Sequence, residues 1–177
     1  MRTSVLGIHC FEDIETVIKN TTDACRITHY DDRCVISCIM ITMLVSKQLQ
    51  NARKGEKTKP SELFENIFEK VLQIYQNNLK EMDLNQDTKE KNLNEFKWYC
   101  DKNRTLEDLQ LDEKNSIGYT FKCMASSLFC FHNTENSSKD AEFFKSQISN
   151  LAKEGGGPKY FIFVFFFFFY FFFVLRC

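Results

Sequence analysis

Residues 28–49 read THYDDRCVISCIMITMLVSKQL, a polar cluster that leads directly into an apolar run. The second part, residues 34–49, is apolar on most sides at helical spacing, which is typical of a helix buried in a core. Asp31 or Asp32 stands at its start, where an acidic side chain can accept hydrogen bonds from the first free backbone amides. This stretch predicts a central buried helix on which the other elements pack.

Apolar residues also recur at intervals of three to four on both sides of this stretch, which is the period of one helical face. The pattern predicts helices over residues 11–18 and 63–75 (the latter with Pro60 in its first turn), a helix over 117–131, and a last one that starts at Ser137 or Ser138. No strand alternation is found. The predicted fold class is therefore all-α, with about seven helices.

Two polar stretches interrupt this pattern. Residues 51–59 and 80–92 are charged and nearly free of bulky apolar side chains, which predicts surface loops. Residues 93–100 then predict a short helix, and Thr105 followed by Asp108 predicts a capped further turn.

The charge balance gives little sign of a charged partner. The chain has 177 residues, with 23 Lys plus Arg against 24 Asp plus Glu, a net charge of -1. The two signs alternate along the expected helices, as on a solvated surface. We therefore expect one domain that binds neither nucleic acid nor an anionic membrane through a basic patch.

Six of the eight cysteines are expected to be reduced thiols in the core: Cys34 and Cys38, four apart in the apolar run, and the scattered Cys25, Cys100, Cys123 and Cys130. The first ten residues lack an apolar run of signal-peptide length, so a cytoplasmic location is expected rather than a secreted disulfide framework. A zinc site is the alternative for Cys34-x-x-x-Cys38, but this pair lacks a second spaced pair and no His lies at finger distance. Core cysteine is the favoured interpretation.

The composition changes abruptly at the C-terminus, where residues 160–175 read YFIFVFFFFFYFFFVL. One interpretation is a membrane anchor, although about 16 residues would span only roughly 24 Å as a helix, less than the ~30 Å hydrocarbon core. The other is a pyrimidine tract translated in frame, since Phe codons are TTT and TTC. We favour translation of a non-coding tract, and separate residues 157–177 from the domain over 1–156.

Three segments, in order, resemble the ADP-ribosylglycohydrolase family, which includes dinitrogenase reductase-activating glycohydrolase and crystallin J1. Residues 28–38 resemble its T-H-x-D-P-R-C-V-x-S-C stretch, with Asp32 in place of Pro. Residues 111–113 and 116–123, LDE and SIGYTFKC, resemble its L-D-E…I-G-Y-T-x-K segment. Residues 144–156, which end in AKEGG, resemble the helix that precedes the family's D-A-D-T segment.

The resemblance implies that the chain is a partial orthogonal helical bundle of the ADP-ribosylglycohydrolase type. It also implies an all-α hydrolase that cleaves ADP-ribose from protein or small-molecule acceptors and uses two Mg²⁺ ions in the complete domain. It places His29 beside the ribose and phosphates and Tyr119 near the adenine, with Asp31 as a further substrate contact. Helix capping is the alternative role for Asp31, and core packing is the alternative for Tyr119.

The family's two metal-binding segments are not found in this sequence. At the expected place of the C-terminal one, residues 157–159 read GPK instead of Asp-x-Asp-Thr. Without them this chain supplies no metal pair to activate water. We therefore expect no catalytic residues, no bound cofactor and no turnover in a truncated fragment. Two alternatives stay open: a non-catalytic module that binds ADP-ribose or a nucleotide, and a helical protein anchored in a membrane through residues 160–175.

Overall fold

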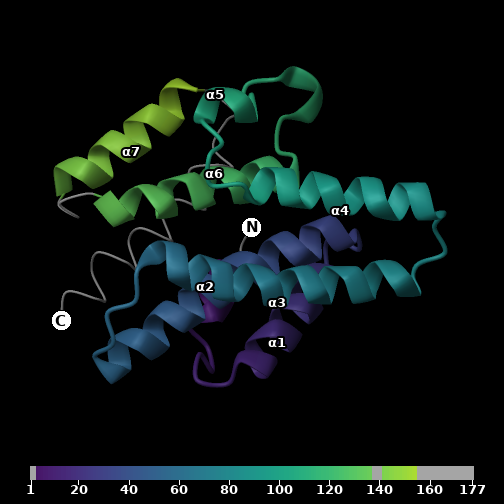
Figure 1. The fold of residues 1–177 in the computed structure, drawn as a ribbon, viewed down its shortest axis with the longest axis horizontal. Coiled ribbons are helices and arrows are strands. Elements are labelled where there is room, and N and C mark those ends of the chain that lie inside the picture. Colours follow the sequence, from purple (N-terminus) through teal and green to yellow (C-terminus); the bar gives the residue numbers. More distant parts are fainter. Residues whose placement is uncertain (1–2, 137–140, 155–177) are drawn as a thin grey trace.

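The computed structural model describes residues 3–136 and 141–154, and this part of the chain consists of helices joined by turns and loops, without strands. The all-α prediction is therefore confirmed. In chain order the elements are η1 (Ser4–Gly7), α1 (Ile14–Arg26), α2 (Asp32–Lys54), α3 (Pro60–Glu81), α4 (Gln86–Cys100), α5 (Leu106–Leu109), η2 (Lys114–Ser116), α6 (Thr120–Asn133), η3 (Thr134–Asn136) and α7 (Ala141–Lys153). Figure 1 shows α3 and α4 lying side by side as an antiparallel pair.

Helix α2 lies at the centre of the bundle and packs against η1, α1, α3 and α6. Every residue from Val35 to Ser46 is buried, as the apolar run predicts. The helix begins after Asp31, whose side chain accepts a hydrogen bond from the Arg33 N–H at 2.9 Å. It ends at Gly55, whose φ of 69° turns the chain out of the helix.

By length and composition α2 could also cross a membrane, with a mean hydropathy of 1.2 over its most apolar window. In the structure, however, 78% of that window is buried against the neighbouring helices. The side chains that a lipid would cover are thus already in contact with α1, α3 and α6. This packing favours a core helix.

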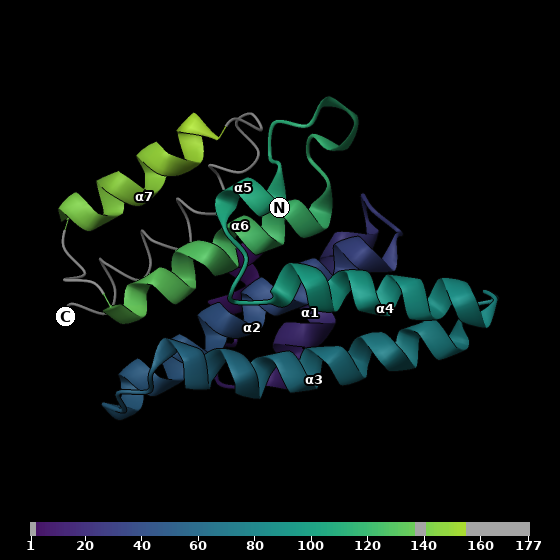
Figure 2. The same ribbon diagram turned by 45° about the horizontal axis from the view of Figure 1, so that its top comes forward.

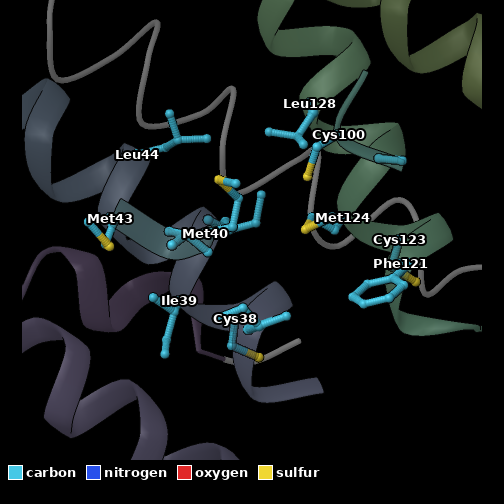
Figure 3. Packing of buried hydrophobic residues seen from close by; sticks show 14 of the residues in the cluster. Cys38, Ile39, Met40, Met43, Leu44, Cys100, Phe121, Cys123, Met124 and Leu128 are labelled. Carbon is cyan, nitrogen blue, oxygen red and sulfur yellow. The ribbon is translucent and has the colours of Figure 1, made fainter. Parts of the chain in front are cut away.

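Figure 2 shows α6 lying beside α2, and their buried side chains belong to one continuous core. Figure 3 shows Met40 on α2 and Met124 on α6 within one apolar cluster. In the same core, the ring of Phe121 packs against the Phe96 ring at a centroid distance of 5.7 Å and the Tyr75 ring at 6.5 Å. Helices α3, α4 and α6 thus share one aromatic centre.

The structure corrects the prediction of a surface loop over residues 80–92. Helix α3 continues to Glu81, and α4 already begins at Gln86 after Asn85, whose side chain accepts a hydrogen bond from the Thr88 N–H at 2.8 Å. Few apolar side chains are needed there because α4 buries only Phe96 and Cys100 completely. The loop predicted over 51–59 is likewise too long, since α2 runs to Lys54.

The cysteines support the core interpretation. All seven in the described ranges are free thiols, and five of them are buried: Cys25, Cys38, Cys100, Cys123 and Cys130. Cys34 is half-buried and Cys10 is exposed. The predicted helix start at Ser137 or Ser138 and the whole of residues 157–177 lie outside the described residues.

Candidate functional site

The start of α2 carries a tight ion pair between neighbouring side chains. The Arg33 guanidinium donates to both carboxylate oxygens of Asp31, with Nη2 at 2.6 Å from Oδ2 and Nε at 3.0 Å from Oδ1. These bonds hold the pKa of the Asp31 carboxyl below its usual range. Asp31 therefore has two tasks, since it caps α2 and also orients Arg33.

Arg33 also contacts the aromatic ring of Tyr119, which lies far from it in the sequence. Its guanidinium carbon lies 5.7 Å from the centroid of that ring, within the range of a cation–π contact. The ring is half-buried and packs edge-to-face against Tyr99 at 6.0 Å and Phe121 at 5.6 Å. Burial, together with the nearby Glu95 carboxylate, raises the pKa of the Tyr119 phenol.

His29 lies in the loop before α2 and faces solvent. Its Nδ1 is 2.9 Å from the Thr28 hydroxyl, and its backbone N–H donates to the Cys25 carbonyl oxygen at 2.8 Å. Of the three residues that the resemblance singles out, the structure thus brings Asp31 and Tyr119 to one guanidinium. His29 stands two residues before Asp31 with a free face toward solvent.

Arg33 was not among the site residues expected from the sequence. It belongs to the quoted resemblance segment, but only the folded structure shows that it joins Asp31 to Tyr119. Its guanidinium is partly exposed, with 39% of the side chain accessible. A planar cation held at a partly open surface beside an aromatic ring is suited to phosphate and purine groups.

The two Mg²⁺ ions that the resemblance implies do not fit the residues present. Within the described ranges, no group of three or more His, Cys, Asp or Glu side chains is placed to hold a metal ion. The nearest carboxylates are already engaged, since Asp31 pairs with Arg33 and Asp32 lies 3.5 Å from Arg26. A Mg²⁺ site needs several hard oxygen ligands in near-octahedral arrangement, and this end of α2 does not offer them.

An open depression of about 580 Å³ lies elsewhere, along residues 5–13 at the N-terminal side. A second, nearly closed cavity of about 10 Å³ is lined by His132, Arg104 and neighbours from α4 and α6. Neither cavity includes Asp31, Arg33 or Tyr119. The candidate site is therefore a surface formed by the start of α2 and the segment before α6.

Comparison with known proteins identifies the family. A sequence profile described as ADP-ribosylglycohydrolase matches residues 1–157 of the 177 residues. No match was found among curated proteins or among solved structures. The matched range contains every helix described above, including both segments that form the Asp31–Arg33–Tyr119 contact. The chain therefore belongs to the ADP-ribosylglycohydrolase family.

Proposed function

We propose that this chain is an ADP-ribosylglycohydrolase-like unit that binds the ADP-ribose group of its ligand at Arg33 and Tyr119, and that it does not hydrolyse ADP-ribosyl bonds by itself. The observation that carries the proposal is the contact of Arg33 with both Asp31 and Tyr119. This contact joins two segments that are far apart in the chain, and each contains one of the resembling motifs.

The chemistry of this contact suits a nucleotide. A guanidinium can donate two parallel hydrogen bonds to a phosphate, and a half-buried phenol ring offers a face for a purine. His29, exposed two residues before Asp31, adds a ring nitrogen that can donate to a phosphate or ribose oxygen. A pyrophosphate would have to compete with Asp31 for Arg33, so the affinity expected for free ADP-ribose is modest.

We propose that this chain has no turnover because it lacks the residues that would bind the two Mg²⁺ ions. The family reaction would use two Mg²⁺ ions to activate water, yet the sequence holds no Asp-x-Asp-Thr segment. Asp31 and Asp32, the two carboxylates at the start of α2, pair with Arg33 and Arg26 instead. Incubation of the purified chain with an ADP-ribosylated peptide and Mg²⁺ should release no ADP-ribose above background, and Mg²⁺-dependent release would refute the proposal.

Binding is tested by titration calorimetry of the full chain with ADP-ribose. Tyr119→Ala should weaken binding by roughly tenfold, because stacking on an aromatic ring contributes on the order of 1 kcal/mol. Tyr30→Ala is the matched control, since Tyr30 is 81% exposed and should leave the affinity unchanged. Absence of binding by the unmodified chain would exclude the nucleotide site.

A membrane-anchored protein is the second candidate, because residues 160–175 are uninterrupted apolar sequence. The proposed location is otherwise the cytoplasm. Sequencing the transcript across the codons for residues 154–176 decides whether the Phe-rich segment is translated. If it is, retention in the membrane pellet after alkaline carbonate would support the anchor, and release would exclude it.

A further inference from the structure

Residues 110–119 connect α5 to α6 and end at Tyr119. Three backbone hydrogen bonds divide this segment into consecutive turns: the Glu113 N–H donates to the Gln110 carbonyl at 3.2 Å, the Ser116 N–H to Glu113 at 3.0 Å, and the Tyr119 N–H to Ser116 at 3.0 Å. Gln110 and Gly118 adopt positive φ values of 47° and 81°. The position of the Tyr119 ring therefore depends on what holds these turns together.

The buried ammonium group of Lys122 holds these turns together. The Nζ of Lys122 donates to the Gln110 carbonyl oxygen at 2.7 Å, to Oε2 of Glu113 at 2.9 Å and to the Ser116 hydroxyl at 2.6 Å. All three of its N–H donors are thus used. These are the same three residues whose carbonyl oxygens accept the backbone bonds of the turns, so one cation fixes every turn between α5 and Tyr119.

The burial of this cation is energetically demanding. Only 5% of the Lys122 side chain is exposed, while its partner Glu113 remains 49% exposed. An apolar side chain of similar length would avoid the cost of removing an ammonium group from water. What the ammonium adds is a fixed geometry, because three acceptors from one irregular segment must meet at one point.

We propose that Lys122 is a positioning residue: it holds residues 110–119 in the conformation that places the Tyr119 ring beside Arg33, where it can receive a purine. This proposal rests on the nucleotide binding proposed above. Lys122 acts through Tyr119 and does not itself touch the ligand.

A double-mutant cycle on the full chain tests this coupling, with ADP-ribose as the probe at a temperature well below unfolding. Lys122→Met should weaken binding by roughly tenfold, about as much as Tyr119→Ala, and the double variant should be no weaker than Tyr119→Ala alone. Lys114→Met is the matched control, because Lys114 is exposed in the same segment, and it should bind like the unmodified chain. Losses that add in the double variant would overturn the proposal, since Lys122 would then act independently of Tyr119.

A second measurement separates the positioning from the nucleotide binding. If the unmodified chain does not bind ADP-ribose, the proposed function fails, and the Tyr119 ring signals in spectra of ¹³C-tyrosine-labelled, ligand-free protein decide the positioning. The rings of Tyr99 and Phe121 lie within 6.0 Å, so displacement of Tyr119 should shift its signals. A shift in Lys122→Met but not in Lys114→Met supports the proposal, and unchanged signals in both overturn it.

Should Lys122→Met fail to fold by far-ultraviolet circular dichroism, Ser116→Ala takes its place in both measurements. This change removes one acceptor and leaves the ammonium its charged partner Glu113. Ser116→Ala should weaken binding and shift the Tyr119 signals as Lys122→Met does, but by less. Full affinity and unshifted Tyr119 signals in Ser116→Ala would overturn the proposal.

Discussion

At the residue scale, Gly7 shows how closely η1 approaches α2. A β-carbon at this position would lie 2.5 Å from the carbonyl oxygen of Thr42 and 2.9 Å from Cβ of Val45. The first of these atoms is backbone inside a long helix and cannot move alone. Only a residue without a side chain therefore lets η1 pack here.

Gly7→Ala is expected to lower the free energy of unfolding by about 1–3 kcal/mol, because overpacking forces the backbone apart. Urea unfolding followed by circular dichroism measures this change. Val5→Ala is the control from the same short helix: Val5 is 43% exposed, so a change within about 0.5 kcal/mol is expected. Equal stability of Gly7→Ala and the unmodified chain would show that η1 does not rest on α2 in this way.

His132 is the second residue with a clear consequence. Its ring lies edge-to-face against Phe64 at 4.7 Å, and burial, aided by Lys102 and opposed by Glu135, lowers its pKa to about 4. The unfolded chain holds this proton with a pKa near 6.5. Between these two values the unfolded state binds more protons than the folded state, so folding stability falls as the pH falls.

We therefore expect stability to decline between about pH 6.5 and pH 4, with His132 contributing on the order of 2 kcal/mol. Urea midpoints at pH 7 and pH 5 measure the slope. His132→Gln should flatten it relative to the unmodified chain. An unchanged slope in His132→Gln would mean that the imidazole is protonated equally in both states.

At the element scale, the four-residue helix α5 depends on its cap. The Thr105 hydroxyl accepts from the Asp108 N–H at 3.2 Å, and Oδ2 of Asp108 accepts from the Thr105 N–H at 2.8 Å. This reciprocal pair confirms the capped turn predicted from the sequence. It also presents Leu106 and Leu109 to the core, where both are buried.

Thr105→Ala is expected to cost about 1 kcal/mol of folding stability, because one amide of the first turn loses its acceptor. Urea unfolding of Thr105→Ala and of the unmodified chain, compared under the same conditions, measures this loss of stability. Glu107→Ala, an exposed change in the same helix, should cost less. A Thr105→Ala chain as stable as the unmodified one would show that α5 is held by its leucines alone.

The sequence predicts those elements whose apolar period is strong. Helices α2, α3 and α6 bury a wide apolar face, and each was predicted at its observed place, although α2 and α3 continue beyond the predicted ranges to Lys54 and Glu81. Helix α4 was half missed because its first turns are polar and lie against little of the core. The Asn85 cap was the available signal, but an Asn in a charged stretch is equally typical of a loop.

The candidate site was predicted only in part, for a different reason. Asp31 and Tyr119 are recognisable from their segments, but their meeting depends on how the loop before α6 folds back toward α2. Arg33 and Lys122 make the contacts that hold the site. The contact of Arg33 with Tyr119 joins segments that are far apart in the chain, and Lys122 takes its acceptors from an irregular segment without periodicity, so the sequence pattern signals neither contact. Periodicity reports which face of a helix is buried, not which distant residue covers it.

At the scale of the whole molecule, the burial of the cysteine side chains shows how tightly the core is closed. Buried thiols come from α1, α2, α4 and α6, so together they sample the packing of these four helices. Burial raises the pKa of Cys100 and Cys130 far above the usual range and leaves them as unreactive thiols. Cys10 in the loop before α1 is exposed by contrast.

Alkylation of the native chain should therefore be strongly selective. With N-ethylmaleimide at pH 7.5, peptide mass spectrometry should find, among the seven cysteines that the structure describes, Cys10 modified first and the half-buried Cys34 later, while the five buried cysteines react only after urea is added. Protection arises from the closed packing of α2 against α1 and α6, since a reagent can reach Cys38 or Cys123 only when these helices separate. Cys10→Ser should remove the fast phase and leave the protection of the others intact. Rapid modification of Cys38 or Cys123 in the folded chain would contradict a closed core, and would mean that the faces of α2 and α6 are open to solvent.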